Sequence, residues 1–166
     1  MDGNQLVELL GHASVDPVLD DFLSRNGVTV RPKREDDVDP VGDAKKGLAF
    51  EYRDPDGFRK AIGEPRSEGK FVLRGVDFYG DKVEGNTGFS GTLPFGLSFT
   101  TTEAEAASLL GAPRKQLAGD KKDGPQNTYC VDDRLVVVNF AVGGASVRWV
   151  RVALPTKFNR QQGLCP

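Results

Sequence analysis

The chain has 166 residues, of which 38% are hydrophobic and 28% charged, and its formal net charge at pH 7 is −2. This length fits a single domain, residues 1–166, with a modest core. No apolar run approaches the roughly 18 residues of a membrane-spanning helix, and the net acidity argues against nucleic-acid binding. The first residues lack the basic start and apolar stretch of a secretory signal. The sequence therefore predicts a cytoplasmic protein without a membrane partner.

The charges are distributed unevenly along the chain. Residues 1–40 carry nine acidic and four basic side chains, whereas residues 114–166 carry four acidic and nine basic ones. The intervening residues 41–113 carry eleven acidic and nine basic side chains. An acidic front and a basic back can steer a partner of opposite charge, although an ordinary solvated surface can have the same composition.

A helix is predicted directly after Asp16, which is a favourable N-cap, with Pro17 in the first turn and Gly27 at the end. His12, the single histidine, follows a Leu-Leu-Gly sequence that is typical of a helix end. We expect His12 to contact the free carbonyls of that end and to have no catalytic role, because the sequence places no nucleophile near it. The apolar face of the predicted helix consists of Val18, Leu19, Phe22 and Leu23.

An acidic run occupies the long loop expected over residues 30–44, and it consists of Glu35, Asp36, Asp37, Asp39 and Asp43. Counted from Asp37, the run partly matches a calcium-binding EF-hand loop. However, Val41 and Leu48 stand where the fifth ligand and the bidentate glutamate belong. One histidine and two distant cysteines are also too few for an ordinary zinc site. We therefore predict neither a metal nor a cofactor, and we assign the run to partner binding because long loops often carry recognition.

The next elements are two strands, Gly47–Arg53 and Phe71–Tyr79, which are rich in apolar and aromatic residues. A third strand is expected at Leu97–Phe99, where apolar residues alternate with a serine. A helix follows it, because Thr102 is a good N-cap and Glu105 completes a capping box. The helix is expected to end at Gly111, before Pro113.

The last third begins with a polar segment, Arg114–Asn127, which we expect to be an exposed loop. Two strands follow at Arg134–Val142 and Ser146–Leu154, joined by a tight turn at Gly143-Gly144. Trp149 lies in the second of these strands and is expected in the core. Cys130 and Cys165 could pair, but a chain without an export signal favours free thiols.

The order of elements indicates two related halves, at about residues 1–82 and 88–156. Each half contains a Leu-Leu-Gly helix end, at Leu9–Gly11 and Leu109–Gly111, followed by two strands. The predicted fold class is α+β, with an antiparallel sheet, helices on one face and two pseudo-repeated helix–hairpin halves. The side chains expected in the core include Phe50, Phe78, Val138, Phe140 and Val150.

Two sequence motifs resemble those of a family of small bacterial proteins with a G-x-LP-x-GL-x-F…LG-x-P signature. The motifs are LPFGLSFTTTEAEAASLLGAP at Leu93–Pro113 and GLAFEYRD at Gly47–Asp54, and the resemblance covers most of residues 1–155. Such proteins resemble immunity proteins, which neutralise toxins delivered by contact-dependent or type VI secretion systems. The repeat of helix and antiparallel strands is also similar to the beta-lactamase inhibitor protein and to small outer-membrane assembly lipoproteins, although this chain has no lipobox cysteine.

The resemblance implies an inhibitor that binds a cognate bacterial toxin and blocks its active site, and it implies no catalytic residue. Many delivered toxins have basic active sites, so carboxylates of the acidic run could occupy such a site and make association salt-dependent. Two alternatives stay open. One is a hydrolase or other enzyme that uses a cleft between the halves, and the other is a chaperone or adaptor that leaves the activity of a secreted effector intact.

Overall fold

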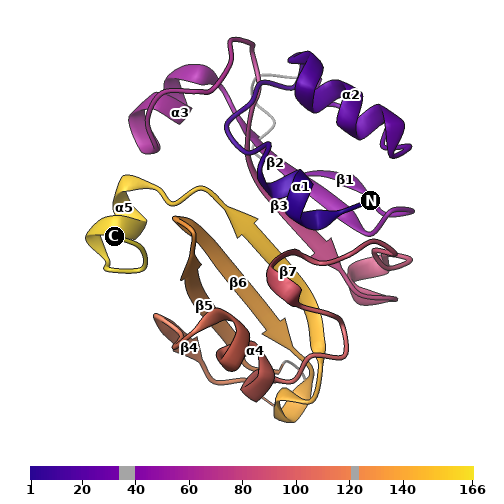
Figure 1. The fold of residues 1–166 in the computed structure, drawn as a ribbon, viewed down its shortest axis with the longest axis vertical. Helices are drawn as coiled ribbons and strands as arrows, with labels where there is room; N and C mark the ends of the chain where they lie inside the picture. Colours follow the sequence, from indigo (N-terminus) through magenta and orange to yellow (C-terminus); the bar gives the residue numbers. More distant parts are fainter. Residues whose placement is uncertain (34–39, 121–123) are drawn as a thin grey trace.

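The computed structural model describes residues 1–33, 40–120 and 124–166, and within them one antiparallel sheet forms the centre of the molecule (Figure 1). The sheet has seven strands in the order β1-β2-β3-β7-β6-β5-β4. The strands from the first half therefore form one side of the sheet and those from the second half the other, and the two sides meet where β3 pairs with β7. This arrangement confirms the predicted α+β class, while the internal repeat stays a prediction. The strands are β1 Val41–Asp43, β2 Leu48–Arg53, β3 Val72–Tyr79, β4 Lys115–Leu117, β5 Gln126–Val131, β6 Arg134–Phe140 and β7 Val147–Ala153.

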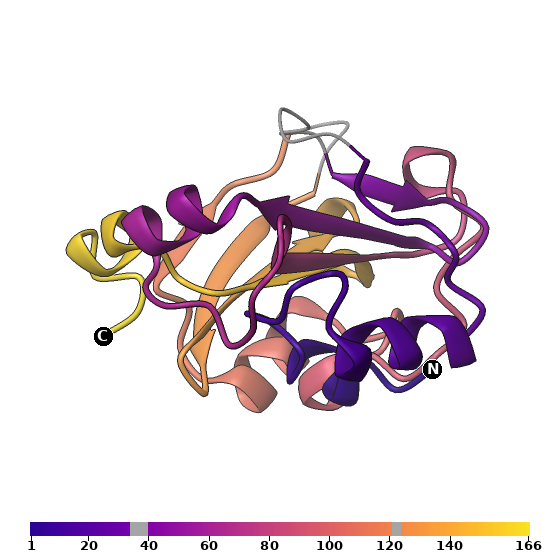
Figure 2. The same ribbon diagram turned by 90° about the horizontal axis from the view of Figure 1, so that it is seen from above.

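The α-helices are short and pack mainly on one face of the sheet. Figure 2 shows α1, α2 and α4 together below the sheet, whereas α3 and α5 lie at one end of it. α3 and α5 occupy that end because they follow the ends of the parallel-running strands β2 and β7. The helices are α1 Gly3–Val7, α2 Pro17–Arg25, α3 Pro55–Ala61, α4 Glu103–Leu110 and α5 Lys157–Gln161, and there are 3-10 turns at Val83–Gly85, Pro94–Gly96 and Val142–Gly144.

The core lies between the sheet and the face that carries α1, α2 and α4. Alternate residues of the four central strands point into it, as the two-residue period of a strand requires. The five side chains expected in the core are all fully buried: Phe50, Phe78, Val138, Phe140 and Val150. The strands predicted around them are confirmed to within two residues at each end.

The two best-marked helices begin where the sequence predicts. The Asp16 side chain accepts a hydrogen bond from the backbone N–H of Val18 at the start of α2. At α4, the capping box between Thr102 and Glu105 is complete. The placement of Val18 on the buried face of α2 is wrong. Its side chain is 56% exposed, and Leu19 and Leu23 form the buried face.

The expected strand at Leu97–Phe99 is wrong, because Leu97 and Ser98 are irregular and a turn begins at Phe99. The segment follows the 3-10 turn at Pro94–Gly96, in which Phe95 has a positive φ of 59°. The backbone N–H of Ser98 then donates to the Thr101 hydroxyl at 2.9 Å. A local side-chain acceptor therefore uses a donor that a sheet would need, which is how serine and threonine compete with regular structure.

The segment Arg114–Asn127 is only partly the exposed loop that the sequence predicts. It contains β4 and the start of β5, which pair from Lys115–Thr128 to Leu117–Gln126. The residues of β4 are exposed, but Asn127 is buried and its amide donates to the Glu103 carboxylate at 2.8 Å. Part of this polar segment therefore forms an edge strand, and its last residue makes a buried contact to α4.

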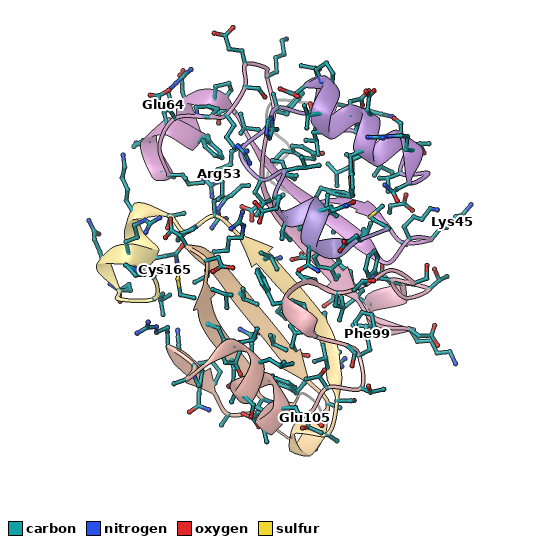
Figure 3. All side chains as sticks on the ribbon, viewed as in Figure 1. Lys45, Arg53, Glu64, Phe99, Glu105 and Cys165 are labelled. Carbon is teal, nitrogen blue, oxygen red and sulfur yellow. A yellow bond between two sulfur atoms is a disulfide. The ribbon has the colours of Figure 1, made fainter. Side chains whose placement is uncertain are left out.

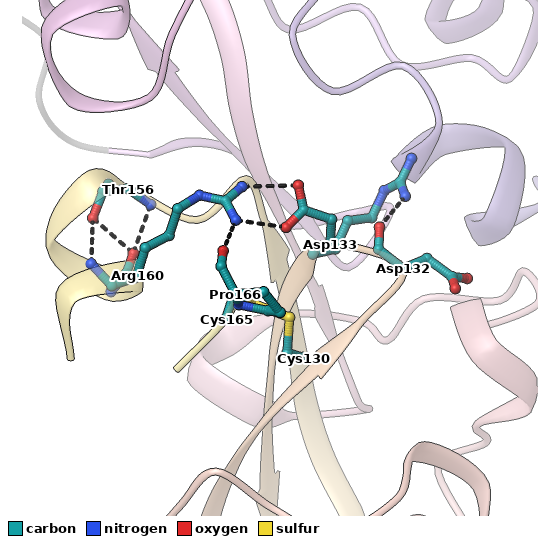
Figure 4. The surroundings of a disulfide bond; sticks show 9 residues. Cys130, Asp132, Asp133, Thr156, Arg160, Cys165 and Pro166 are labelled. Carbon is teal, nitrogen blue, oxygen red and sulfur yellow. Dashed lines mark hydrogen bonds and ion pairs between the residues drawn. A yellow bond between two sulfur atoms is a disulfide. The ribbon is translucent and has the colours of Figure 1, made fainter. Parts of the chain in front are cut away.

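The expectation of free thiols is also wrong, because Cys130 and Cys165 form a disulfide (Figure 4). The two residues are 35 positions apart in the sequence. They meet because the chain turns back after α5, which carries Cys165 to the end of β5. The composition of the first residues was therefore a poor guide to the state of these cysteines.

Candidate protein-binding face

Among the described residues, the second face of the sheet carries no helix except α5, which lies at one end of it, and we call this face the open face. Strand pairing places one row of residues across its centre. The row runs from β2 to β5 through Ala49, Asp77, Arg151, Val137 and Thr128. A second row contains Tyr79, Trp149, Asn139 and Gln126, and a third contains Glu51, Gly75, Ala153, Leu135 and Cys130.

An ion pair lies near the middle of the open face. The Arg151 guanidinium donates to both carboxylate oxygens of Asp77, at 2.6 and 2.7 Å. The Asp77 side chain is only 6% exposed, whereas that of Arg151 is 40% exposed. These hydrogen bonds raise the pKa of Arg151 above its ordinary value. The pair therefore holds one edge of the guanidinium in place while leaving the group partly accessible to a partner.

A second charged group lies beside the first, toward the β2 edge. The Arg74 guanidinium donates to Glu51, and an Arg53 guanidinium nitrogen lies 3.7 Å from the same Glu51 oxygen. Figure 3 shows Arg53 toward the end of the sheet that is also occupied by Cys165. The open face thus presents three guanidinium groups and two carboxylates near the β2–β3–β7 junction. This cluster has one positive charge in excess.

Trp149 and Tyr79 occupy opposing positions on β7 and β3 at the other end of the open face. Both side chains are partly exposed, so the expectation that Trp149 lies in the core is wrong. Tyr79 donates from its hydroxyl to Asp77 at 3.3 Å, and burial raises the pKa of the phenol. The alternation along β7 could have located Trp149, because Val150 and Val152 face the core and Trp149 and Arg151 therefore face away.

The acidic run falls almost entirely outside the part of the chain that the structure describes. Glu35, Asp36, Asp37 and Asp39 lie in residues 34–39, which are not described. Asp43 is the described member, and it lies at the end of β1, opposite Leu48. The assignment of the run to partner binding therefore stays a prediction.

His12 has a different environment from the one that the sequence predicts. Its Nδ1 atom lies 3.4 Å from the Asp16 carboxylate, so its neighbour is an acidic side chain. A hydrogen bond from Ser67 is the largest cause of the lowered pKa of Asp16. The aspartate thus stands between the histidine and the serine. Nucleophilic catalysis needs the histidine next to the hydroxyl, with the aspartate behind it, so this order does not activate Ser67.

Two hollows lie at the α3 end of the molecule. One, of about 540 Å³, is lined mainly by the residues after α3, including Ser67. The other, of about 340 Å³, lies between α3, α5 and the β5–β6 turn, and Phe58 and Leu154 contribute to its apolar lining. Among the described residues, no three His, Cys, Asp or Glu side chains are grouped so that they could hold a metal ion. No helix within them is long and apolar enough to cross a membrane.

Comparison with known proteins gives little guidance. No protein-family description and no curated protein matches the chain. Its fold can be aligned with the crystal structure of YjgB, a DUF4309 family protein from Bacillus subtilis. The TM-score is 0.34 at 12% sequence identity, and the alignment covers 92% of this chain and 97% of that chain. A likeness of this degree carries no argument about function.

Proposed function

We propose that this protein is a non-catalytic inhibitor of the immunity type, which binds a bacterial toxin through the open face of its sheet. The observation that supports this proposal best is the set of side chains on that face. Trp149, Tyr79 and Arg151 are partly exposed there on paired strands, and tryptophan, tyrosine and arginine are the residue types that most often dominate protein–protein binding.

The backbone supports the same proposal. Ala49, Gly75 and Ala153 lie on the open face but are themselves buried, so the surface that a partner would meet there consists of the larger side chains around them. The strands are fixed by pairing on both sides, and Arg151 is held by Asp77. A surface that is already ordered loses little conformational entropy on binding.

The charges suggest how a toxin is attracted. The excess positive charge of the cluster around Arg151, Arg74 and Arg53 favours acidic groups, while the acidic run favours a basic active site. We propose that the open face supplies the stable contact and that the acidic run accelerates association. Replacing Asp36, Asp37 and Asp39 with asparagine should then reduce the salt dependence of the association rate without removing binding.

The disulfide supports a site of action in an oxidising compartment, because disulfides are rare in proteins kept in the reducing cytoplasm. We propose this location in place of the cytoplasmic one that the sequence predicts. An immunity protein in such a compartment would meet a toxin after delivery across the outer boundary of the cell.

Two substitutions test the proposal, each of which removes an apolar side chain from the surface, on opposite faces of the molecule. The candidate partner is a purified toxin encoded beside the gene for this protein, and binding is measured by calorimetry. Trp149→Ala should weaken binding at least about thirtyfold, because it removes a large aromatic anchor. Leu109→Ala is the matched control, since Leu109 is 52% exposed on α4 on the opposite face, and it should change binding less than about twofold.

The same experiment separates inhibition from the alternatives. Protection against the toxin should be lost with Trp149→Ala and kept with His12→Ala, because His12 is assigned no chemistry. A folded His12→Ala variant without protection would favour an enzyme. Tight binding that leaves the toxin fully active would favour an adaptor. Equal effects of Trp149→Ala and Leu109→Ala would contradict the assignment of the open face.

A further inference from the structure

We propose that residues 157–166 form a strap that the Cys130–Cys165 disulfide holds over one end of the open face, and that reduction of this bond releases it. Release of the strap requires no partner. Any effect of this release on partner binding rests on the function proposed above.

The strap has little packing of its own to hold it in place. α5 contains five residues, and none of them is buried. Phe158 is 64% exposed, whereas Cys165 is 2% exposed. A helix this short is unstable in isolation. The burial that anchors the strap is therefore concentrated at the residue that forms the disulfide.

The polar contacts of the strap are exposed and few. Arg160 donates to both carboxylate oxygens of Asp133 at 2.8 Å (Figure 4). The Lys157 ammonium donates to the backbone carbonyl of Arg59 at 3.3 Å. The side chains of Arg160 and Asp133 are 37% and 62% exposed, and exposed ion pairs contribute little to stability. The hydrogen bonds between Thr156 and Asn159 stabilise the start of α5 but do not attach it to the sheet.

The disulfide places the end of the strap beside an apolar part of the open face. Cys130 pairs with Leu135 across β5 and β6, and Leu135 pairs with Ala153 of β7. Tyr129, the neighbour of Cys130, is fully buried in the core, so Cys130 points to the open face. Leu135 is 8% exposed in spite of its position there. Release of the strap should therefore expose Leu135 and extend the apolar surface toward the middle of the open face.

The chemistry is ordinary thiol–disulfide exchange with a dithiol. A dithiol thiolate attacks one protein sulfur, which breaks the Cys130–Cys165 bond and forms a mixed disulfide. The second thiol of the reagent then displaces the protein sulfur. The protein gains two electrons and two protons and ends with two thiols, and the reagent becomes a disulfide.

The experiment compares the oxidised protein, the protein treated with dithiothreitol, and the Cys165→Ser variant. Cys165→Ser leaves β5 intact, so the sheet should fold as in the parent protein. The readouts are backbone ¹⁵N relaxation and the rate at which trypsin cleaves after Lys157 and Arg160. Reduction and Cys165→Ser should both make residues 157–166 mobile and increase this cleavage at least about tenfold. The amide chemical shifts of β2 and β3, which lie away from the strap, should stay close to those of the oxidised protein.

Arg160→Met is the matched control, because it removes the ion pair to Asp133 and keeps the disulfide. Cleavage after Lys157 should then rise less than about threefold. The proposal is overturned if the untreated protein already has the mass of two additional hydrogens, since the thiols are then free. It is also overturned if the strap stays ordered after reduction, or if the whole sheet changes with it. None of these outcomes depends on a partner, so they are distinct from failure of the proposed function.

Discussion

At the residue scale, the ion pair of Asp77 and Arg151 is the best-defined polar feature of the open face. A nearly buried carboxylate is stable only while its hydrogen-bond partner is present. Asp77 is held by two hydrogen bonds from Arg151, and a weaker one from Tyr79 joins them. The pair therefore contributes to the stability of the fold as well as to any binding of a partner. The effects on stability and on binding have to be measured separately.

Arg151→Met should lower the free energy of unfolding by about 2 kcal/mol, because Asp77 stays buried without its main donor. Combining it with Asp77→Asn should recover part of that loss, since the uncompensated charge is then absent. Urea denaturation measures both effects. Arg59→Met is the control, because Arg59 pairs with Asp56 and Glu64 on the exposed side of α3, and its loss should leave the free energy of unfolding nearly unchanged. Equal costs for Arg151→Met and Arg59→Met would contradict the assignment.

At the element scale, local sequence signals located α2, α4 and the central strands well, whereas α3 and α5 were not predicted. The capping residues of α2 and α4 and the apolar runs of β2, β3, β6 and β7 are local features, so the sequence alone predicted them. Errors occurred where a contact between distant residues decided the outcome. The start of β5 is fixed by the bond from Asn127 to Glu103, and the C-terminal turn is fixed by Cys130. Neither contact could be predicted from neighbouring residues.

The capping box of α4 allows a direct test of one such local signal. Thr102→Ala should destabilise the protein by about 1 kcal/mol, because the first turn of α4 loses a side-chain acceptor. The pKa of Glu105 should rise slightly as well. The hydrogen bond from the backbone N–H of Thr102 is the largest cause of the lowered pKa of Glu105, and it stays in the variant. Only the smaller lowering of the pKa by the Thr102 hydroxyl should be lost. Ser108→Ala on the exposed side of the same helix is the control and should have little effect. A stability unchanged by Thr102→Ala would show that packing alone fixes this helix.

At the scale of the whole molecule, the sheet separates two kinds of surface. One face is closed by α1, α2 and α4 and contains the core, and the other carries Trp149, Tyr79 and the arginine cluster. The sequence predicted the first face because buried residues recur with a regular period. It did not predict the second, because the assembly of Asp77, Arg151 and Glu51 depends on the pairing of strands that are far apart in the chain.

The central claim is that a partner protein covers the open face. Hydroxyl-radical footprinting of the free protein and of its complex with the toxin tests it most directly, because tryptophan and tyrosine side chains are labelled readily where they are accessible. Labelling of Trp149 and Tyr79 should fall at least about fivefold in the complex, as expected for residues at the centre of an interface. Labelling of Leu109 on α4 should stay unchanged. Unchanged labelling of Trp149 together with protection of Leu109 would contradict the claim and would place the contact on the helical face.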